Sequence, residues 1–203
     1  MSTRKVILMI QARMGSSRLP GKVLLEVKGK PILLHQISRL ASAVECHELV
    51  VITSTLRQDD VLYEFCERNG VACFRGDALD LLSRHYEAAK KFDAEVVVKI
   101  PSDCPLSDPA LVDFVVATHL KQKADYTSNY HPASFADGFD VEVFEFEALE
   151  RAYFEASKDW EREHTTPYIW ERPHVFDLVN IVNQLGNHFL THRLTLDYPE
   201  DFE

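Results

Sequence analysis

Short apolar runs alternate with longer segments of helical periodicity through the first 124 residues of this 203-residue chain. Each apolar run has the length of a strand, and each segment between two runs is long enough to cross over a sheet as a helix. The strand-like runs cover residues 5–10, 48–53, 71–74 and 95–100, and the helical segments cover residues 31–43, 59–69, 80–92 and 109–122. This alternation predicts an α/β fold in which helices sandwich a mostly parallel sheet.

The pattern changes near residue 125. We expect two extended pieces, one helix and then a returning strand, at residues 124–129, 140–146, 146–156 and 192–197 respectively. No repeat, low-complexity tract or Gly/Ser linker separates the two halves. The sequence therefore predicts a single domain over residues 1–203, with a small second lobe inserted at about residues 125–190.

The charge balance limits the classes of partner. Acidic residues number 32 and basic residues 22, and the resulting net charge of −10 argues against nucleic acid or an anionic membrane as a partner. The apolar run near the amino terminus is too short for a secretory signal, and no run approaches the length of a membrane span. We therefore expect a cytoplasmic protein, whose four cysteines lack the spacing of a zinc site and are reduced thiols.

A loop rich in cations, at residues 10–24, directly follows the first apolar run. Its cations are Arg13, Arg18 and Lys22, and two glycines and two serines lie among them. Ligands of open parallel sheets bind at the carboxyl ends of the strands, so this loop is predicted to hold phosphate groups. It is not a Walker loop, because five residues separate Gly15 from Gly21, and the chain contains no Gly-x-Gly-x-x-Gly turn for a dinucleotide.

Asp103 follows the strand-like run at residues 95–100. Its carboxylate is therefore expected at the same edge of the sheet as the phosphate loop. A divalent cation commonly accompanies bound phosphate groups, and Mg²⁺ prefers carboxylate oxygens. Asp103 is a candidate magnesium ligand on these grounds, and a turn residue before Pro105 is the alternative role.

The loop resembles the signature Ala-Arg-x-x-Ser-x-Arg-Leu-Pro-x-Lys of the cytidylyltransferases that make CMP-activated sugars, the superfamily of CMP-KDO synthetase and acylneuraminate cytidylyltransferase. The matching residues are Ala12, Arg13, Ser16, Arg18, Leu19, Pro20 and Lys22. The similarity is greatest to the spore-coat polysaccharide branch and extends from Val6 to Glu203. It implies a nucleotide-diphospho-sugar transferase-like fold of the GT-A, Rossmann-like type, with a nucleotide-binding half at residues 1–124 and an acceptor-binding lobe with the returning strand at residues 125–203.

Two further motifs of this superfamily imply a magnesium site. Its Gly-Asp-x-Pro-Leu-Ile motif, whose aspartate binds magnesium, is matched at Asp103, although Pro101 and Ser102 replace the usual Thr and Gly. The serine leaves the base preference open, because it brings a Cβ to a position where the backbone approaches the nucleotide. A late Asp-x-Pro-Glu-Asp motif is matched at residues 197–201, which makes Asp197 the second expected ligand of Mg²⁺.

A motif of the spore-coat branch, Arg-Gly-x-x-x-Asp-Val-Leu-x-Arg, is matched from Arg75 and Gly76 onward. Asp80 and Arg84 within it lie four residues apart on one predicted helix face, and we expect them to brace each other. The predicted nucleotide-binding residues are Gln11, Ala12, Arg13, Gly15, Ser16, Arg18, Lys22, Ser54, Arg75, Gly76 and Asp103. Of these, the predicted catalytic residues are Arg13, Lys22 and Asp103.

The expected acceptor-binding residues lie in the second lobe. Asp140 and Glu142 alternate with apolar residues in a Gly-x-Asp-Val-Glu-Val-Phe segment that closes the acceptor pocket in the spore-coat branch, and a solvated strand face is the alternative. Asn129, Glu163 and His164 belong to two other segments that match this branch. General-base catalysis by His164 stays open, since a structural role is the commoner one for histidine.

These resemblances imply a magnesium-dependent cytidylyltransferase, in which an acceptor oxygen attacks the α-phosphorus of CTP and pyrophosphate leaves. The acceptor would be an acid sugar or a related hydroxyl or phosphate compound used in the biosynthesis of a surface polysaccharide such as the spore coat. A glycosyltransferase of the same fold and a catalytically silent nucleotide-binding protein are the alternatives. The aromatic-rich segment at residues 153–176 could form either a homodimer interface or the core of its own lobe.

Overall fold

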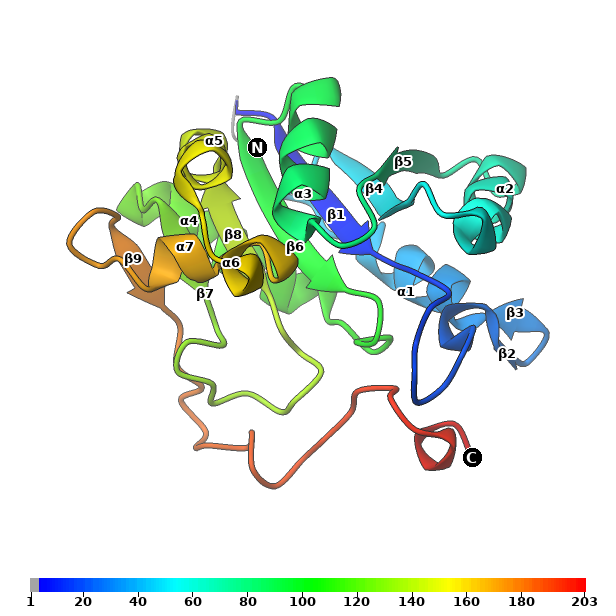
Figure 1. Cartoon of the computed structure of the whole chain (residues 1–203). Helices are drawn as coiled ribbons and strands as arrows, with labels where there is room; N and C mark the ends of the chain where they lie inside the picture. The colour runs from blue at the N-terminus through cyan, green and yellow to red at the C-terminus, as the bar shows by residue number, and fades with distance from the viewer. Residues whose placement is uncertain (1–3) are drawn as a thin grey trace.

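The computed structural model describes residues 4–203, which contain a seven-stranded sheet with the order β5-β4-β1-β6-β8-β7-β9 (Figure 1). Four parallel neighbours form its first part, namely β5 (Ala72–Gly76), β4 (Glu48–Ser54), β1 (Val6–Gln11) and β6 (Val96–Pro101). The second part consists of β8 (Glu142–Glu145), β7 (Tyr126–Ser128) and β9 (Leu178–Asn180). Strand β8 is antiparallel to both β6 and β7, so it joins the two parts into one mixed sheet.

Helices cover both faces of the sheet (Figure 1). One face carries α1 (Ile32–Leu40), α2 (Asp60–Arg68) and α4 (Pro109–Gln122), and the other carries α3 (Leu81–Lys91), α5 (Phe146–Glu155) and α7 (Pro167–Trp170). The short helix α6 (Asp159–Glu163) lies between α5 and α7 in the chain. The two faces of the sheet carry separate hydrophobic cores. Consecutive residues of a strand belong to different cores, as Leu8 and Met9 of β1 do. Burial on both faces explains why the central strands are apolar throughout and do not alternate.

The first four long strands and the first four helices confirm the predicted α/β fold. Two helices have residues at their ends that suit those positions. Asp108 caps α4 by accepting a hydrogen bond from Ala110 N at 3.0 Å, and Gly70 follows α2 with a φ of 65°. The sequence did not predict the hairpin of β2 (Glu26–Val27) and β3 (Lys30–Pro31), strand β9, or the short helices α6 and α7.

The predicted returning strand at residues 192–197 is wrong. Strand β9 occupies the place beside β7, so the later segment crosses the loops below the sheet instead of joining it (Figure 1). Its backbone bonds go to those loops. Leu194 N donates to Asp137 O at 2.7 Å, and Leu196 N donates to Asp103 O at 2.8 Å. The alternating side chains therefore belong to a segment that lies across loops, and these contacts bring the end of the chain to the carboxyl end of β6.

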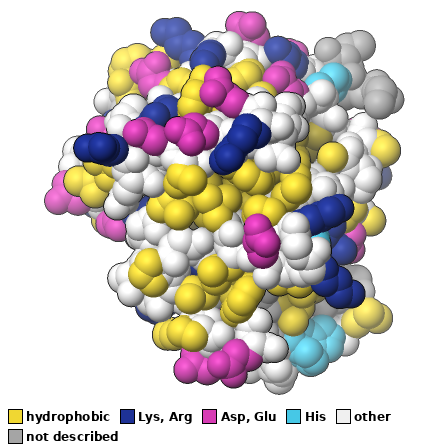
Figure 2. Space-filling model, turned by 90° about the vertical axis from the view of Figure 1, so that its right-hand side faces the viewer, with side chains coloured by type: hydrophobic (Ala, Val, Ile, Leu, Met, Phe, Trp, Pro, Cys, Tyr) yellow, Lys and Arg dark blue, Asp and Glu magenta, His cyan; other side chains and the backbone are white. Residues whose placement is uncertain are grey.

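The aromatic segment at residues 153–176 packs largely within the protein. Tyr168 contacts Phe176 with ring centroids 6.1 Å apart, and Tyr153 stacks on Tyr86 of α3 at 4.2 Å, whereas Phe154 is 70% exposed. Figure 2 views the side on which Figure 1 shows α2 and the β2–β3 hairpin, and hydrophobic side chains gather there between charged ones. No helix among residues 4–203 is long and apolar enough to span a membrane.

Candidate active site

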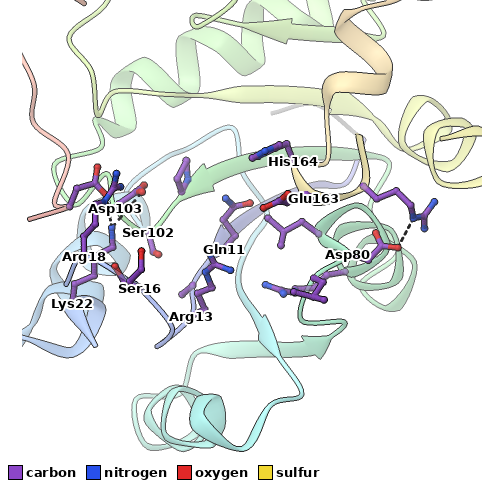
Figure 3. Close-up of a pocket in the computed structure, with 18 of the residues that line it drawn as sticks. Gln11, Arg13, Ser16, Arg18, Lys22, Asp80, Ser102, Asp103, Glu163 and His164 are labelled. Carbon is purple, nitrogen blue, oxygen red and sulfur yellow. Dashed lines mark hydrogen bonds and ion pairs between the residues drawn. The ribbon is translucent and has the colours of Figure 1, made fainter. Parts of the chain in front are cut away.

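A cleft of about 640 Å³ lies at the carboxyl ends of β1 and β6 (Figure 3). The loop after β1 and the segment after β6 form one end, the amino-terminal turn of α3 forms the other, and Glu163 and His164 lie across the cleft from Gln11 (Figure 3). The predicted site residues that line it are Gln11, Ala12, Arg13, Ser16, Arg18, Lys22, Asp103, Glu163, His164 and Asp197. The structure thus brings the predicted phosphate loop and both predicted magnesium ligands to one cleft.

A buried carboxylate that the sequence did not single out holds the phosphate loop. Asp59 is 1% exposed at the start of α2, and its Oδ1 accepts a hydrogen bond from Met14 N at 2.7 Å. Its other oxygen accepts a hydrogen bond from the Ser54 hydroxyl. Gly21 closes the loop with a φ of 71°, and its N–H donates to Met14 O at 3.0 Å. Ser54, predicted to meet the nucleotide, does not line the cleft and instead positions Asp59.

Lys22 brings the two predicted magnesium ligands together. Its Nζ lies 3.0 Å from Asp197 Oδ1 and 3.6 Å from Asp103 Oδ2, and it donates a hydrogen bond to Leu196 O at 2.6 Å. Arg18 Nη2 reaches the same oxygen of Asp197 at 2.6 Å. Figure 3 shows Arg18, Lys22 and Asp103 clustered at the phosphate-loop end of the cleft. Two aspartates from distant parts of the sequence therefore meet around one ammonium group.

The charges at this end stabilise one another. Burial alone would raise the pKa of Asp197, but the hydrogen bonds and charges of Lys22 and Arg18 outweigh burial and lower that pKa. Asp197 in turn raises the pKa of Arg18. Both groups stay charged at neutral pH, so either can exchange its partner for a charged ligand.

Asp103 and Asp197 fit a magnesium ion in both chemistry and position. Their oxygens are hard ligands of the kind that Mg²⁺ prefers, and the Lys22 ammonium already places a cation between them. Among residues 4–203, no three carboxylate, imidazole or thiol side chains gather as a metal centre. A magnesium ion held by these two carboxylates would complete its coordination with phosphate oxygens and water, as Mg²⁺ does in many nucleotide sites.

Ser102 stands where the superfamily has glycine, and the structure accommodates it. Its N–H donates to Gln11 O at 3.1 Å, which ties the end of β6 to the end of β1. It is not among the residues of the described chain that have a positive φ. A serine therefore causes no backbone strain here.

An ion pair joins the N-cap residue of α3 to α6 at the other end of the cleft (Figure 3). Arg162 Nε lies 2.6 Å from Asp80 Oδ2, and Asp80 also caps α3 by accepting a hydrogen bond from Ser83 N at 2.8 Å. The predicted brace between Asp80 and Arg84 is wrong. Because Asp80 is the capping residue and lies outside the helix, its carboxylate meets α6 and not the next turn of α3.

Arg84 donates its hydrogen bonds to backbone carbonyls instead. Its Nε bonds to Asp77 O at 2.8 Å, and its Nη2 bonds to Ala78 O at 3.0 Å. The stem of the side chain packs against Gly76, where an added Cβ would lie 2.9 Å from Arg84 Cγ. Gly76, predicted to lie near the nucleotide, does not line the cleft and makes room for Arg84.

Arg75 and Gly15 also do not line the cleft. Arg75 donates to Ser54 O at 3.0 Å and pairs with Asp60 at 2.6 Å, so its guanidinium fastens the connection between β4 and α2. Gly15 lies close to Gln58, whose Nε2 would be 2.8 Å from an added Cβ. Both residues support the walls around the site.

Glu142 is buried within the sheet and does not line the cleft. On β8 it forms an ion pair with Lys99 of β6 and accepts hydrogen bonds from the hydroxyl groups of Tyr126 and Thr166, at 2.7 and 2.5 Å. Its carboxylate oxygens are therefore already engaged by the protein. The alternative of a solvated strand face is wrong for Glu142, because the residue is buried.

Asn129 and Asp140, the other predicted acceptor residues outside the lining, belong to the connection before β8. Asn129 Nδ2 donates to Phe139 O at 2.7 Å, and its Oδ1 accepts from Val141 N at 2.9 Å, so the side chain staples this connection to β7. Burial raises the pKa of Asp140 to about 7, and the negative charge of Asp137 adds to the effect. The surroundings of Asp140 therefore disfavour the charged form of its carboxylate.

Sequence reasoning missed the structural roles of three polar groups, namely Asp59, Lys99 and Arg162. Each has its main partner on another element, so no local spacing reveals the contact. The only signal was weak, since Lys99 is a charged residue inside an apolar strand-like run. A charge in a buried strand requires a partner, and here that partner is Glu142.

Comparison with known proteins identifies the family of this chain. A family profile described as cytidylyltransferase matches residues 7–202. The chain is 37% identical over 199 residues to the uncharacterized protein MJ1063 of Methanocaldococcus jannaschii and 31% identical over 203 residues to the spore coat polysaccharide biosynthesis protein SpsF of Bacillus subtilis. These alignments cover 98% of this chain and 81% and 83% of those proteins. The solved structure of a cytidylyltransferase from Leptospira borgpetersenii superposes with a TM-score of 0.93 at 36% identity, over 98% of this chain and 84% of that one. The chain belongs to the cytidylyltransferase family.

Proposed function

We propose that this nucleotidyltransferase transfers CMP from CTP to an oxygen of a sugar-like acceptor, with Mg²⁺ bound by Asp103 and Asp197. The observation that carries the proposal is the meeting of Arg18, Lys22 and the two aspartates at one end of the cleft. A leaving pyrophosphate needs cations close to its oxygens, and a divalent cation needs hard oxygen ligands. Both requirements are met within a few ångströms.

The roles of the individual residues follow from their places in the cleft. Arg13, Arg18 and Lys22 would bind the β- and γ-phosphates and neutralise the charge that develops on pyrophosphate. Magnesium, when bound, would supply positive charge at the α-phosphate. Glu163 and His164, which lie across the cleft from the phosphate loop, are the lining residues best placed to contact an acceptor or the ribose (Figure 3).

The proposed acceptor is an acid sugar or a related hydroxyl or phosphate compound. SpsF is described as a spore coat polysaccharide biosynthesis protein, and this relative supports a role in the synthesis of a surface polysaccharide. A cytoplasmic location and a homodimer remain predictions. Sedimentation velocity measures the second of these directly.

Pyrophosphate release tests the proposed reaction. We expect release to require CTP, Mg²⁺ and one member of a panel of sugar acids, polyols and phosphate esters, with a CMP-linked product detected by mass spectrometry. Asp103→Asn and Asp197→Asn should each lower turnover by roughly 100-fold or more. Asp93→Asn is the matched control, because Asp93 is exposed, far from the lining, and has a φ of 51° that asparagine tolerates.

Three outcomes would contradict the proposal. Transfer of a sugar from a nucleotide-sugar donor would indicate a glycosyltransferase instead. CTP binding without turnover on any acceptor would indicate a silent nucleotide-binding protein. Full activity of the two aspartate variants would remove these residues from the reaction.

A further inference from the structure

The cleft continues beyond the end that is proposed to bind phosphate, and different side chains line it there. Lys22 and Asp103 lie at one end, and Asp80 lies at the other (Figure 3). A triphosphate held by the loop therefore directs its nucleoside toward the amino-terminal turn of α3. Leu79 and Leu81 line the cleft on that side, and Leu79 is 80% exposed. These side chains offer an apolar surface to a flat base.

Arg84 lies on the same side and is buried without a carboxylate partner. The residue is 1% exposed, and all hydrogen bonds of its side chain within residues 4–203 go to the carbonyls of Asp77 and Ala78. Burial lowers the pKa of Arg84. The negative charges of Asp59, Asp77 and Asp80 oppose this effect, and the nearby positive charge of Arg13 adds to it. Burying a charge costs folding free energy unless a group of opposite charge pairs with it. Packing alone therefore does not explain why an arginine occupies position 84.

One nitrogen of Arg84 remains available to a ligand. Nη1 makes no hydrogen bond to any residue from 4 to 203, and it is not one of the polar atoms sealed from solvent without a partner. Arg84 also lines the cleft. The two carbonyls fix the plane of the guanidinium, and Gly76 leaves room for its stem. Nη1 is therefore a hydrogen-bond donor with a fixed orientation. Such a donor favours ligands that place an acceptor opposite it over ligands that do not.

We infer that Arg84 donates hydrogen bonds from Nη1 to the O2 and N3 edge of cytosine and so selects CTP over UTP, an inference that rests on the proposed use of CTP. A guanidinium has donors only. Cytosine presents two neighbouring acceptors, O2 and N3, to such a group. Uracil carries a hydrogen on N3, so the same group would meet a donor with a donor.

Equilibrium binding separates base recognition from phosphate binding. Titration calorimetry with Mg²⁺ and without acceptor would compare CTP, UTP and inorganic tripolyphosphate on wild type and Arg84→Met. We expect wild type to prefer CTP over UTP by about 10- to 100-fold, and Arg84→Met to lose most of this preference. The affinity for tripolyphosphate should be unchanged, because that probe contacts the loop after β1 and not α3.

Arg75→Met is the matched control. Arg75 is also an arginine of the β5–α3 region whose guanidinium bonds to backbone carbonyls, at Ser54 and Leu56, but it does not line the cleft. Removing it should leave the ratio of CTP to UTP affinity as in wild type. The comparison therefore controls for the loss of an arginine that fastens a connection through backbone carbonyls.

The outcomes distinguish the inference from the function on which it rests. An unchanged CTP/UTP ratio in Arg84→Met overturns the inference alone, and so does an equal loss for CTP, UTP and tripolyphosphate. A wild-type protein that does not bind CTP overturns the proposed function itself. If Arg84→Met does not fold, the binding of 2-thio-CTP to the wild-type protein tests the inference instead. Its sulfur is a weaker acceptor, so we expect roughly 10-fold weaker binding than CTP, and equal binding would overturn the inference.

Discussion

Lys99 and Glu142 form a buried ion pair between β6 and β8. Burial alone would raise the pKa of Glu142, but the charge of Lys99 and the hydrogen bonds from Thr166 and Tyr126 lower it to about 2. Glu142→Gln leaves the Lys99 ammonium buried without a counter-ion. We expect this variant to lose about 3–5 kcal/mol of unfolding free energy. Urea denaturation at neutral pH measures the loss.

A double variant, Lys99→Met with Glu142→Gln, distinguishes the unpaired charge from other effects of the substitution. It removes both charges together, so it should be more stable than Glu142→Gln alone. A loss below about 1 kcal/mol in Glu142→Gln would contradict the importance of the pair. So would a double variant whose losses simply add.

Asp140 is a carboxylate whose ionisation opposes folding. Burial raises its pKa from 3.8 to about 7, and the charges of Asp137 and Glu142 contribute. A folded-state pKa above the unfolded value means that stability falls as pH rises through the window between them, by up to about 1.4 kcal/mol per pH unit. Asp140→Asn should therefore match wild type near the acidic end of this window and be the more stable protein above its upper end. Denaturation curves with a chelator present measure the difference, and a difference that does not vary with pH would contradict the raised pKa.

The connection before β8 crosses the carboxyl-terminal tail, residues 192–203, at Gly138. Gly138 has a φ of 106°, and an added Cβ would lie 2.9 Å from Leu194 C and 3.0 Å from Thr195 N. Gly138→Ala therefore adds backbone strain and also displaces the tail that carries Asp197 to the cleft. We expect a loss of roughly 1–3 kcal/mol in unfolding free energy, together with weaker Mg²⁺-dependent CTP binding. Thermal unfolding and calorimetry measure the two effects.

Gly186→Ala separates the strain from the displacement. Gly186 also has a positive φ, 119°, but nothing lies within 4 Å of the place where its Cβ would be. This variant should carry the backbone cost alone and bind CTP as wild type does. Equal loss of CTP binding in the two glycine variants would show that the crossing at Gly138 does not position the site.

The elements differ in how far the sequence determines them. Strands β1, β4, β5 and β6 and the helices that follow them are predictable because apolar runs and helix-end signals are local properties of the chain. The tail is mispredicted as a strand because alternation of apolar and polar residues also arises in a segment that lies across loops. Tertiary contacts determine whether such a segment pairs with a strand or with loops. The same limit applies within the site. The spacing of cations in the loop at residues 10–24 predicts the phosphate end, whereas the contacts of Asp59 and Arg84 depend on how the helices dock.

The two ends of the sequence meet at the cleft through charges that can exchange partners. The chain has a net charge of −10, yet Arg18 and Lys22 gather at one point, where Asp197 of the tail pairs with both. A bound triphosphate would compete with Asp197 for both cations. Its own negative charge would then repel Asp197 unless a divalent cation lies between them. Nucleotide alone is therefore expected to loosen the tail, and nucleotide with Mg²⁺ is expected to hold it in place.

Amide hydrogen exchange of the tail measures this opposition. The amides of Leu194 and Leu196 donate to carbonyls outside the tail, at 2.7 and 2.8 Å, so their exchange reports how firmly the tail is held. Saturating CTP with a chelator should speed their exchange, and CTP with Mg²⁺ should slow it below the rate of the protein alone. Asp197→Asn removes the repelled charge, so exchange in this variant should respond far less to Mg²⁺. Equal protection of the wild-type tail by CTP with and without Mg²⁺ would mean that other contacts hold the tail, and the coupling between its aspartate and the loop cations would then have to be abandoned.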